Sequence, residues 1–498
     1  MLSRVLGFVR DVLTAAYLGA GPIADAFFVA LKLPNFFRRV TAEGAFSVSF
    51  VPMFSGMEET KGRGAALDFA SEARSMMLLI LFPFTVCMIV AMPWVISAIT
   101  PGFIGDAVRF GAAVELSRIT FPYILLISLV ALYGGVLNSF ERFAAFAAAP
   151  VFFNLTLIAA IVGLTPYTPT VGHAMAYGVA ASGIVQLIWM ILNCYRFEIE
   201  LKLKKPSLTP EIKKLFRLMG PAIIGAGVVQ INLFVDMILA SFLPHGAISY
   251  LYYADRLYQL PLAVIGIAIG TALLPMLSRK IKAGDKKGAT VLTRDAVKYG
   301  LILSIPAAVA LAVLAELIMQ VLFERGAFDR AASLASAAAL NAYVFGLPAY
   351  ILVKIFSTGF FAGEDTKTPV KFAIITTICN TLLSIALIKP MGHVGIATAT
   401  AITAWVNVVL LARAARVNFE NLWDGMKPVI LYILMVSGVM ALSIGWIYAL
   451  SDNHTLAEKA MDLIMIVIGG ATVYFVLLHL TGVMRFSEIR QIFQKPKA

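Results

Sequence analysis

Fourteen long apolar stretches make up most of this chain of 498 residues. Each reaches about the 20 residues that an α-helix needs to cross the hydrocarbon core of a bilayer, and some are longer. Charged residues make up only 14% of the chain, whereas about 25% is usual in soluble proteins. The apolar stretches are continuous, while the strands of a membrane barrel alternate apolar and polar residues. The sequence therefore predicts an all-α polytopic membrane protein with 14 transmembrane helices and no separate soluble domain.

The distribution of basic residues orients these spans in the membrane. The spans are predicted at residues 1–19, 24–54, 75–99, 112–137, 146–164, 173–195, 215–242, 247–278, 298–322, 333–361, 370–388, 394–412, 428–450 and 460–481. Of the 40 lysines and arginines, 27 lie in or beside connections that follow even-numbered spans or in the C-terminal tail, and only 5 lie in connections that follow odd-numbered spans. Basic residues accumulate in cytoplasmic loops, so both termini are predicted to be cytoplasmic. The net charge of +12 reflects this bias, and we predict no nucleic acid partner.

The chain repeats part of its own sequence at a distance of 223 residues. Residues 50–55 (FVPMFS) reappear at 273–278 (LLPMLS), and the same shift carries Pro83 to Pro306. Chance similarity between apolar helices is the alternative, but transporters with paired halves of this kind are common and bind substrate between the halves. We predict a first lobe at 1–196 with spans 1–6, a second lobe at 197–416 with a basic linker and spans 7–12, and an addition at 417–498 with spans 13 and 14 and a cytoplasmic tail.

The first two spans carry charged residues inside otherwise apolar sequence. The set is Arg4, Arg10, Asp11, Asp25, Lys32, Arg38, Arg39 and Glu43. Asp25, Lys32 and Arg39 follow one another at intervals of seven residues, which places them on one face of a helix, and Pro34 is predicted to bend that helix. Mutual neutralisation of acids and bases between packed helices is the structural alternative. Because ionisable groups in a bilayer mark functional sites and the bases here outnumber the acids, we predict a site for an anion.

The second lobe supplies one more candidate cation, Arg256, at the start of span 8. Arginine suits a phosphate or diphosphate because its planar guanidinium donates two parallel hydrogen bonds. Gly266 and Gly270 in the same span form a small-residue pair, which predicts close helix packing. Lys354 in span 10 is expected either to form an ion pair or to extend toward the membrane surface.

Two further polar residues inside spans carry a weaker signal. Asp236 and Asn380 could supply oxygen ligands to a small hard cation, although hydrogen bonding between helices explains them more simply. The chain has no P-loop and no dinucleotide fingerprint. We therefore expect no ATP hydrolysis and predict that the protein is not an enzyme.

Several motifs in this chain resemble those of one membrane-protein family. They are residues 3–11 (SRVLGFVRD), 19–22 (GAGP), 25–35 (DAFFVALKLPN), 38–39 (RR), 42–47 (AEGAFS), 119–126 (ITFPYILL) and 252–256 (YYADR). On these residues the chain resembles the MurJ (MviN) family of bacterial lipid II flippases, and the resemblance extends over nearly its whole length. Members of the family usually begin a dozen or so residues before the first motif, so we expect a short first span with Arg4 near its start.

The resemblance implies a fold, a site and a driving force. The fold is that of the multidrug/oligosaccharidyl-lipid/polysaccharide exporters, with two six-helix lobes and two C-terminal helices that form a groove for the lipid tail. Its essential cations correspond to Arg4, Arg10, Arg38 or Arg39, and Arg256, with Asp25 as an essential acid, lining a cavity that holds the lipid-linked diphosphate; Lys32 and Glu43 lie in the same motifs. Some relatives bind sodium in the second lobe, so Asp236 and Asn380 are the predicted sodium ligands. The membrane potential is the other candidate driving force, and no further cofactor is expected.

We therefore predict a lipid II flippase of the bacterial cytoplasmic (inner) membrane. It would move undecaprenyl-diphosphate-linked peptidoglycan precursor from the inner to the outer leaflet by alternating access. Its expected partners are lipid II, membrane lipids and the cell-wall synthesis machinery. Two alternatives stay open: an exporter of drugs or polysaccharide lipids with the same fold, and a membrane scaffold of cell-wall assembly that transports nothing.

Overall fold

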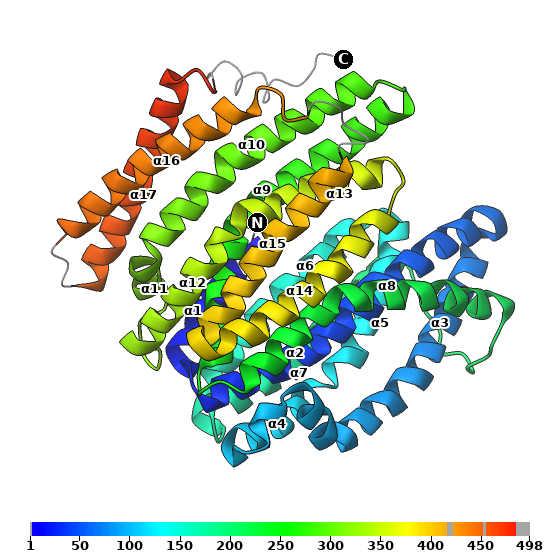
Figure 1. Cartoon of the computed structure of the whole chain (residues 1–498). Helices are drawn as coiled ribbons and strands as arrows, with labels where there is room; N and C mark the ends of the chain where they lie inside the picture. Colours follow the sequence, from blue (N-terminus) through cyan, green and yellow to red (C-terminus); the bar gives the residue numbers. More distant parts are fainter. Residues whose placement is uncertain (1, 416–421, 452–454, 485–498) are drawn as a thin grey trace. The chain divides into compact units, whose positions relative to one another are not determined.

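The computed structural model describes residues 2–415, 422–451 and 455–484, and these residues are helical along most of their length (Figure 1). The side chains at 41–43, 224–226, 228, 229, 231 and 267 lie outside that description. Extended pairing in the described residues is limited to a single bridge between Arg325 and Phe328, so the all-α prediction is confirmed. The helices are α1 (Leu2–Leu18), α2 (Pro22–Phe37), the π-helix η1 (Arg38–Phe46), α3 (Ser47–Ile99), η2 (Pro101–Phe103), α4 (Ala107–Thr120), α5 (Tyr123–Ser139), α6 (Phe143–Leu164), η3 (Thr165–Tyr167), α7 (Val171–Arg196), α8 (Pro210–Ser241), α9 (Ala247–Lys282), α10 (Lys286–Val313), α11 (Ala315–Phe323), α12 (Arg330–Phe345), α13 (Leu347–Ala362), α14 (Lys367–Met391), α15 (His393–Ala415), α16 (Met426–Ala449) and α17 (Leu456–Leu480).

Eleven helical segments of the described chain are long and apolar enough to cross a membrane, whereas the sequence predicts 14 spans. The difference has three local causes. Helix α1 has only 17 residues, predicted spans 2 and 3 lie in one helical segment (Pro22–Ile99) that is broken at Gly62, and in α8 the apolar segment that can be delimited among fully described residues is only Asn232–Ser241. The chain is thus a multi-pass helical membrane protein, and the count of 14 stays a prediction.

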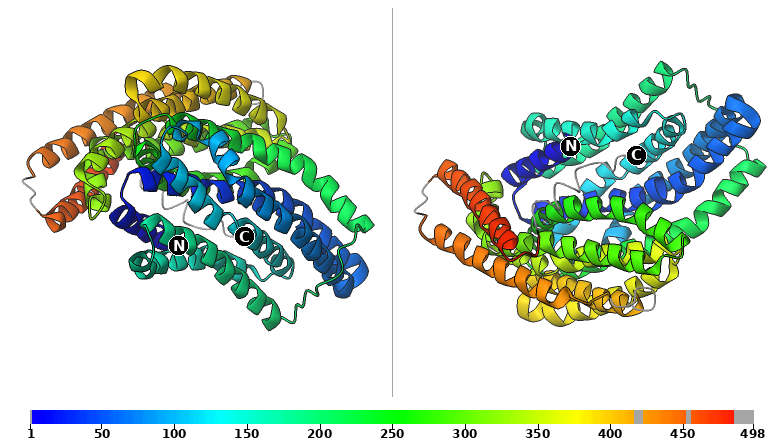
Figure 2. Two further views of the ribbon diagram at one scale, coloured as in Figure 1. Left: turned by 90° about the horizontal axis from the view of Figure 1, so that it is seen from below. Right: turned by 90° about the horizontal axis from the view of Figure 1, so that it is seen from above.

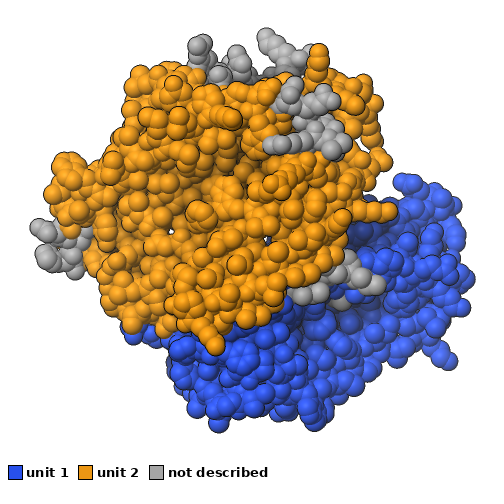
Figure 3. Space-filling view, in the orientation of Figure 1, with its two compact units in different colours: residues 1–249, 325–329 blue, residues 250–324, 330–498 orange. Residues whose placement is uncertain are grey.

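The described chain divides into two compact units, which Figure 3 shows in different colours. Unit 1 comprises residues 1–249 and 325–329, and unit 2 comprises 250–324 and 330–498. Helix α8 belongs to unit 1 because it packs against η1 and α3. The linker before it also lies on α3, where the amides of Lys202 and Lys204 donate to the hydroxyls of Ser71 and Ser75 at 3.0 and 3.1 Å. Packing therefore divides the chain after Ser249, and the lobe boundary that the repeat gives at residue 196 remains a prediction.

Helix breaks recur at matching places in the two halves of the sequence. Helix α3 is interrupted at Gly62, where φ is 83°, and the turn between α9 and α10 contains Gly284, where φ is 71°. With the shift of 223 residues, these two glycines are one position apart. A positive φ is readily adopted only by glycine. The fourth span is also broken in both halves, at Phe121–Pro122 and at Gly346, so the repeat extends to the irregular parts of the helices.

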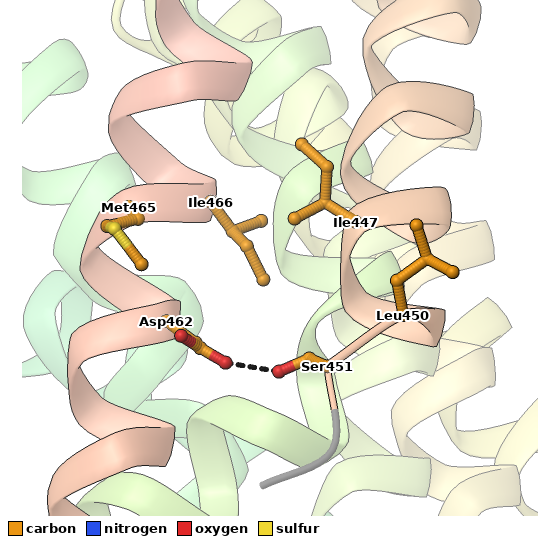
Figure 4. A pocket seen from close by; sticks show the side chains of 6 residues that line it. All are labelled: Ile447, Leu450, Ser451, Asp462, Met465 and Ile466. Carbon is orange, nitrogen blue, oxygen red and sulfur yellow. Dashed lines mark hydrogen bonds between the residues drawn. The ribbon is translucent and has the colours of Figure 1, made fainter.

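Helices α16 and α17, which lie outside the repeat, pack against each other within unit 2 (Figure 2). Their exposed surface is largely apolar and includes Leu442, Trp446 and Ile468, as expected of spans that face lipid. Near their connection Ser451 donates a hydrogen bond to Asp462 (Figure 4). A cavity of about 330 Å³ lies there, lined by these two residues and by Ile447, Leu450, Met465 and Ile466. Its one carboxylate is already engaged by a hydroxyl, so this cavity shows no cluster of converging polar groups.

The segment 325–329 belongs to unit 1 through close backbone contacts with the end of α1. The Ala327 amide donates to the Ala16 carbonyl at 2.8 Å. A Cβ added at Gly19 would lie 2.3 Å from the Ala327 oxygen, and one at Gly326 would lie 2.2 Å from the Ala16 oxygen. Both glycines have positive φ, 67° and 58°. The first glycine of the 19–22 motif therefore lets two backbones touch.

Gly19→Ala is expected to loosen this contact by about 2 kcal/mol or more, because the methyl group meets a carbonyl and the backbone conformation is strained. Hydrogen exchange of peptides that cover 322–330 should accelerate by at least about tenfold. Gly21→Ala is the matched control, since a Cβ there has nothing within 4 Å. Equal exchange in the two variants would contradict the assignment of the contact to Gly19.

Candidate functional site

Helix α2 carries a proline near its end, and a neighbouring helix replaces the hydrogen bond that the proline removes. Pro34 has no N–H, so the carbonyl of Ala30, four residues earlier, has no intrahelical donor. Thr120 Oγ1 of α4 donates to that carbonyl at 2.9 Å in a buried contact. Satisfying a freed backbone group in this way makes proline tolerable inside a spanning helix. Helix α2 is therefore joined to α4 at the level of Pro34.

The π-helix η1 follows α2 and begins with two of the predicted cations, Arg38 and Arg39. Wide turns of this kind are rare and often occur at functional sites. Arg38 is half-buried and its Nε donates to Asn35 Oδ1 at 3.3 Å, whereas Arg39 is exposed. Lys32, earlier on α2, is half-buried, and the Glu43 side chain lies outside the described residues. Helix α2 continues past Pro34 to Phe37 and the helical winding changes at Arg38, so the bend at Pro34 stays a prediction.

Helix α1 presents its two arginines in different environments. Arg10 donates to Asp11 Oδ1 at 2.7 and 3.1 Å and to Asn154 Oδ1 of α6 at 2.9 Å. Its guanidinium also lies 5.7 Å from the centre of the Phe153 ring, and its side chain is only 12% exposed. Arg4 is exposed, and it forms no ion pair with any residue that the structure describes. Arg10 is thus held rigidly, while Arg4 keeps its charge available.

Asp25 is completely buried at the start of α2, where it binds the start of α9. Its Oδ2 accepts from the Gly246 amide at 2.8 Å, and its Oδ1 accepts from the Ser249 amide at 2.9 Å and the Ser249 hydroxyl at 2.7 Å. The first amides of a helix have no partner within that helix and attract negative charge. The carboxylate therefore caps α9 and, in this conformation, lines no open cavity.

A second set of polar contacts holds the connection between α8 and α9. Arg109 of α4 donates to the Leu243 carbonyl at 3.0 Å and forms an ion pair with Asp106 at 2.8 Å. Asp106 also faces His245 at 3.5 Å. Burial opposes its ionisation, but hydrogen bonds from the amide and side chain of Arg109 outweigh burial and lower the pKa of Asp106. Residues 241–249 are thus bound to unit 1 immediately before the chain enters unit 2.

In unit 2 the predicted cation is Arg256 of α9. Its guanidinium lies 4.7 Å from the centre of the Tyr252 ring, one turn earlier, in a cation–π contact. The neighbouring acid, Asp255, accepts a hydrogen bond from Gln259 on the same helix. Arg256 is half-buried. The Tyr252 ring therefore covers one face of the guanidinium and restricts its orientation.

The residues predicted to bind sodium fall in different units. Asp236 lies on α8 in unit 1, and Asn380 lies on α14 in unit 2. Asn380 is buried and its Oδ1 accepts from the Thr403 hydroxyl at 3.3 Å. Ser384, one turn later on α14, is also buried, and its hydroxyl has no hydrogen-bond partner among the described residues. The side-chain oxygens of Asn380, Ser384 and Thr403 are of the kind that binds a hard cation. A sodium site that also includes Asp236 stays a prediction.

Sequence reasoning missed the residues that hold the charged groups in place. Asn154 donates to the Ser3 carbonyl at 3.0 Å while it binds Arg10, and so joins α6 to α1. Its presence as a lone amide in a very apolar span was the available signal. No such signal pointed to Gly246 and Ser249, because they bind Asp25 across more than 220 residues of sequence.

Comparison with known proteins gives consistent results along the chain. The family model described as "Lipid II flippase MurJ" matches residues 14–466. A protein of Rhizobium meliloti (strain 1021) named "Probable lipid II flippase MurJ" is 38% identical, with 98% of this chain and 93% of that protein covered. One of Burkholderia cenocepacia named "Lipid II flippase MurJ" is 35% identical, with 82% and 80% covered.

Solved structures agree with this assignment. The structure titled "Lipid II flippase MurJ, inward closed conformation" is similar with a TM-score of 0.80 and 28% identity, and 96% of each chain is covered. An inward-facing multidrug transporter of the MATE family has a TM-score of 0.70 at 14% identity, with 85% of this chain and 96% of that one covered. The second likeness concerns the fold alone. The matches along nearly the whole sequence show that this chain belongs to the MurJ family.

Proposed function

We propose that this protein is a lipid II flippase, which moves undecaprenyl-diphosphate-linked peptidoglycan precursor from the inner to the outer leaflet of the cytoplasmic membrane. The observation that carries the proposal is an imbalance of charge in the first two helices. The acids are already engaged, because Asp11 accepts from Arg10 and Asp25 accepts from the start of α9. Arg4 is exposed and forms no ion pair with any residue that the structure describes. The first helix therefore keeps one positive charge for a ligand, which suits a diphosphate.

The cations would replace water around the diphosphate while it crosses the membrane. Guanidinium groups donate paired hydrogen bonds to phosphate oxygens, and the rigid hold of Asp11 and Asn154 on Arg10 would keep one such group oriented. The polyprenyl chain would stay in lipid beside the apolar surface of α16 and α17. We place both termini in the cytoplasm, following the distribution of basic residues in the connections.

Alternating access requires contacts that can form and break, and Asp25 has the geometry for one. It joins the start of α2 to the start of α9, at the point where the chain leaves unit 1. With the termini inside, this end of both helices would face the outside. Breaking the contact would release α9 at its outer end, so we assign Asp25 to the closure of the outer side.

The membrane potential can drive this transport. Moving one charge through 100 mV is worth about 2.3 kcal/mol, so two negative charges that leave a negative interior would gain about 4.6 kcal/mol. Cationic side chains that move with the headgroup would reduce this gain. Coupling to sodium through the oxygens near Asn380 is the second source of energy that we propose.

The charges argue against the two alternative functions. An exporter of cationic drugs should carry unmatched acids in its spanning helices, whereas Asp11 and Asp25 are both matched here. A scaffold that transports nothing should not need an exposed arginine such as Arg4 in its first helix. Lipid II and the surrounding lipids are the partners that follow, with contacts to the cell-wall synthesis machinery as a further proposal.

Leaflet-resolved labelling of the lipid-linked precursor tests the function directly. A strain depleted of its own flippase should accumulate precursor in the inner leaflet, and expression of this chain should restore precursor to the outer leaflet and restore growth. Full restoration by a variant with Arg4, Arg10 and Arg256 all replaced by glutamine would contradict the anion site. Failure of the wild-type chain to move precursor would contradict the function itself.

A further inference from the structure

Lys354 of α13 lies against the two glycines of α9 that the sequence marks as a packing pair. A Cβ added at Gly266 would lie 3.2 Å from Lys354 Cδ and 3.4 Å from its Nζ, and one at Gly270 would lie 3.2 Å from its Cε. The small-residue pair therefore accommodates a lysine side chain, and we call the space above Gly266 and Gly270 the glycine groove. Both helices belong to unit 2.

Within the described part of the chain, the ammonium of Lys354 forms no ion pair with a carboxylate. The residue is exposed, although it lies inside the apolar helical segment Arg330–Ala362. A charged group in a spanning helix is energetically unfavourable and usually serves a function. The sequence-based alternatives for this residue were an ion pair or extension toward the membrane surface, and the structure contains no such ion pair.

The direction of the side chain also argues against extension to the surface. The basic end of α9 carries Arg279, Lys280 and Lys282, which basic-residue topology places in the cytoplasm. A lysine that extended to that surface would direct its ammonium beyond Gly270. Instead, Nζ lies beside Gly266, and Cε is the one Lys354 atom within 4 Å of the Gly270 position. The charge therefore lies at the level of Gly266, near the middle of α9 and not at its basic end.

This position places Lys354 in line with Arg256. At 100° per residue, Arg256, Gln259, Gly266 and Gly270 fall within roughly 80° of one face of α9. Arg256 and Gly266 are ten residues apart, which is roughly 15 Å along a helix. Two cations thus follow one face of α9 at different depths.

We propose that Lys354 is a second cationic contact in unit 2 for the anionic headgroup, which it receives at a different depth of the membrane from Arg256. The proposal rests on the proposed function and adds a residue and a path to it. A lysine suits a transient contact because its ammonium is a compact charge on a flexible stem, whereas arginine holds a phosphate in fixed geometry. The glycine groove provides room for the stem when the headgroup is elsewhere.

Binding of undecaprenyl diphosphate to the purified full-length protein in detergent tests the contact. Loss of one charge-assisted hydrogen bond should weaken binding by about tenfold or more in Lys354→Met. Lys354→Arg keeps the charge and should bind within about threefold of wild type. Lys371→Met, which removes an exposed lysine of α14, is the matched control and should bind as wild type does. If Lys354→Met binds and flips as well as the unmodified protein, the proposal is overturned and the flippase function still stands. If the unmodified protein itself neither binds nor flips, the function is contradicted.

A double-mutant cycle separates a binding role from helix packing. Gly266→Ala places a methyl group 3.4 Å from the ammonium and should weaken binding by about threefold or more, because the lysine must shift. The same change in a Lys354→Ala background should have no further effect, since the groove is then empty. An equal loss in both backgrounds would show that Gly266 serves packing alone and would overturn the groove assignment. If Lys354→Met proves unstable, the same variants still test whether Lys354 contacts the headgroup.

Discussion

Arg10→Ala is expected to reduce flipping by at least about a hundredfold. The guanidinium would no longer donate two charge-assisted hydrogen bonds to the diphosphate, each worth about 1.5 kcal/mol or more. Arg10 is a tightly held cation of unit 1, with Asp11 and Asn154 both accepting from it. Arg10→Lys should lose nearly as much, since a single ammonium cannot reproduce the two directions of the guanidinium fork. Leaflet-resolved precursor labelling measures the effect.

A companion variant separates this loss from misfolding. Arg10→Ala alone removes the ion pair of the buried Asp11, which can destabilise unit 1 by about 3 kcal/mol. Arg10→Ala combined with Asp11→Asn removes both charges and should recover thermal stability but not transport. Asn154→Ala should retain part of the activity, since Asp11 still holds the guanidinium. Transport at the wild-type rate in the stable double variant would refute a role for Arg10 in binding the headgroup.

Asp25→Ala is expected to release the start of α9, with loss of transport. The substitution removes the acceptor for three hydrogen bonds in a site with no exposure, and donors left unpaired in such a site cost about 1–3 kcal/mol each. The amides of Gly246 and Ser249 report the change themselves. Their hydrogen exchange should accelerate by at least about a hundredfold, which corresponds to roughly 3 kcal/mol.

Ser249→Ala is the graded control for this experiment. It removes the hydroxyl donor and keeps both amides on the carboxylate, so a loss of about 1 kcal/mol and an acceleration of about fivefold are expected. Exchange at 246–249 that stays at the wild-type rate in Asp25→Ala would show that the cap is not what holds α9. Transport that survives a released α9 would show that this contact does not close the outer side.

The sequence was sufficient for the all-α membrane fold because its signals are local. Continuous apolar stretches predict spanning helices without any knowledge of distant contacts, whereas the paired lobes that the repeat predicts stay a prediction. The repeat could not predict that α8 packs against η1 and α3, since this depends on surfaces that face each other only after folding. The environments of the charged candidates on α1 and α2 differ from the periodic pattern. Asp25 shares its heptad spacing with Lys32 and Arg39, yet it is completely buried and Arg39 is exposed.

The partner of the glycine pair of α9 could not be predicted from the sequence either, because the contact forms only after folding. Small residues four apart predict a close neighbour, but the spacing says nothing about which chemical group approaches. Here it is the stem of Lys354, which comes from a helix more than 80 residues away in sequence. Asn154 was overlooked for a related reason: a single amide in an apolar span has many potential partners, and only the fold selects Arg10 and Ser3.

The bond between Thr120 and the Ala30 carbonyl restricts how the first unit can deform. If α2 slid along α4 by one turn, the Ala30 carbonyl would lose its hydrogen-bond donor. A buried carbonyl without a donor would destabilise the new position by several kcal/mol. Any opening motion that leaves the bond intact must carry both helices together as a rigid pair, with Arg38 and Arg39 immediately beyond the end of α2. The hinges of such a motion then belong at the ends of this pair, in the turn at 19–21 and in the loosely wound η1, rather than at the proline itself.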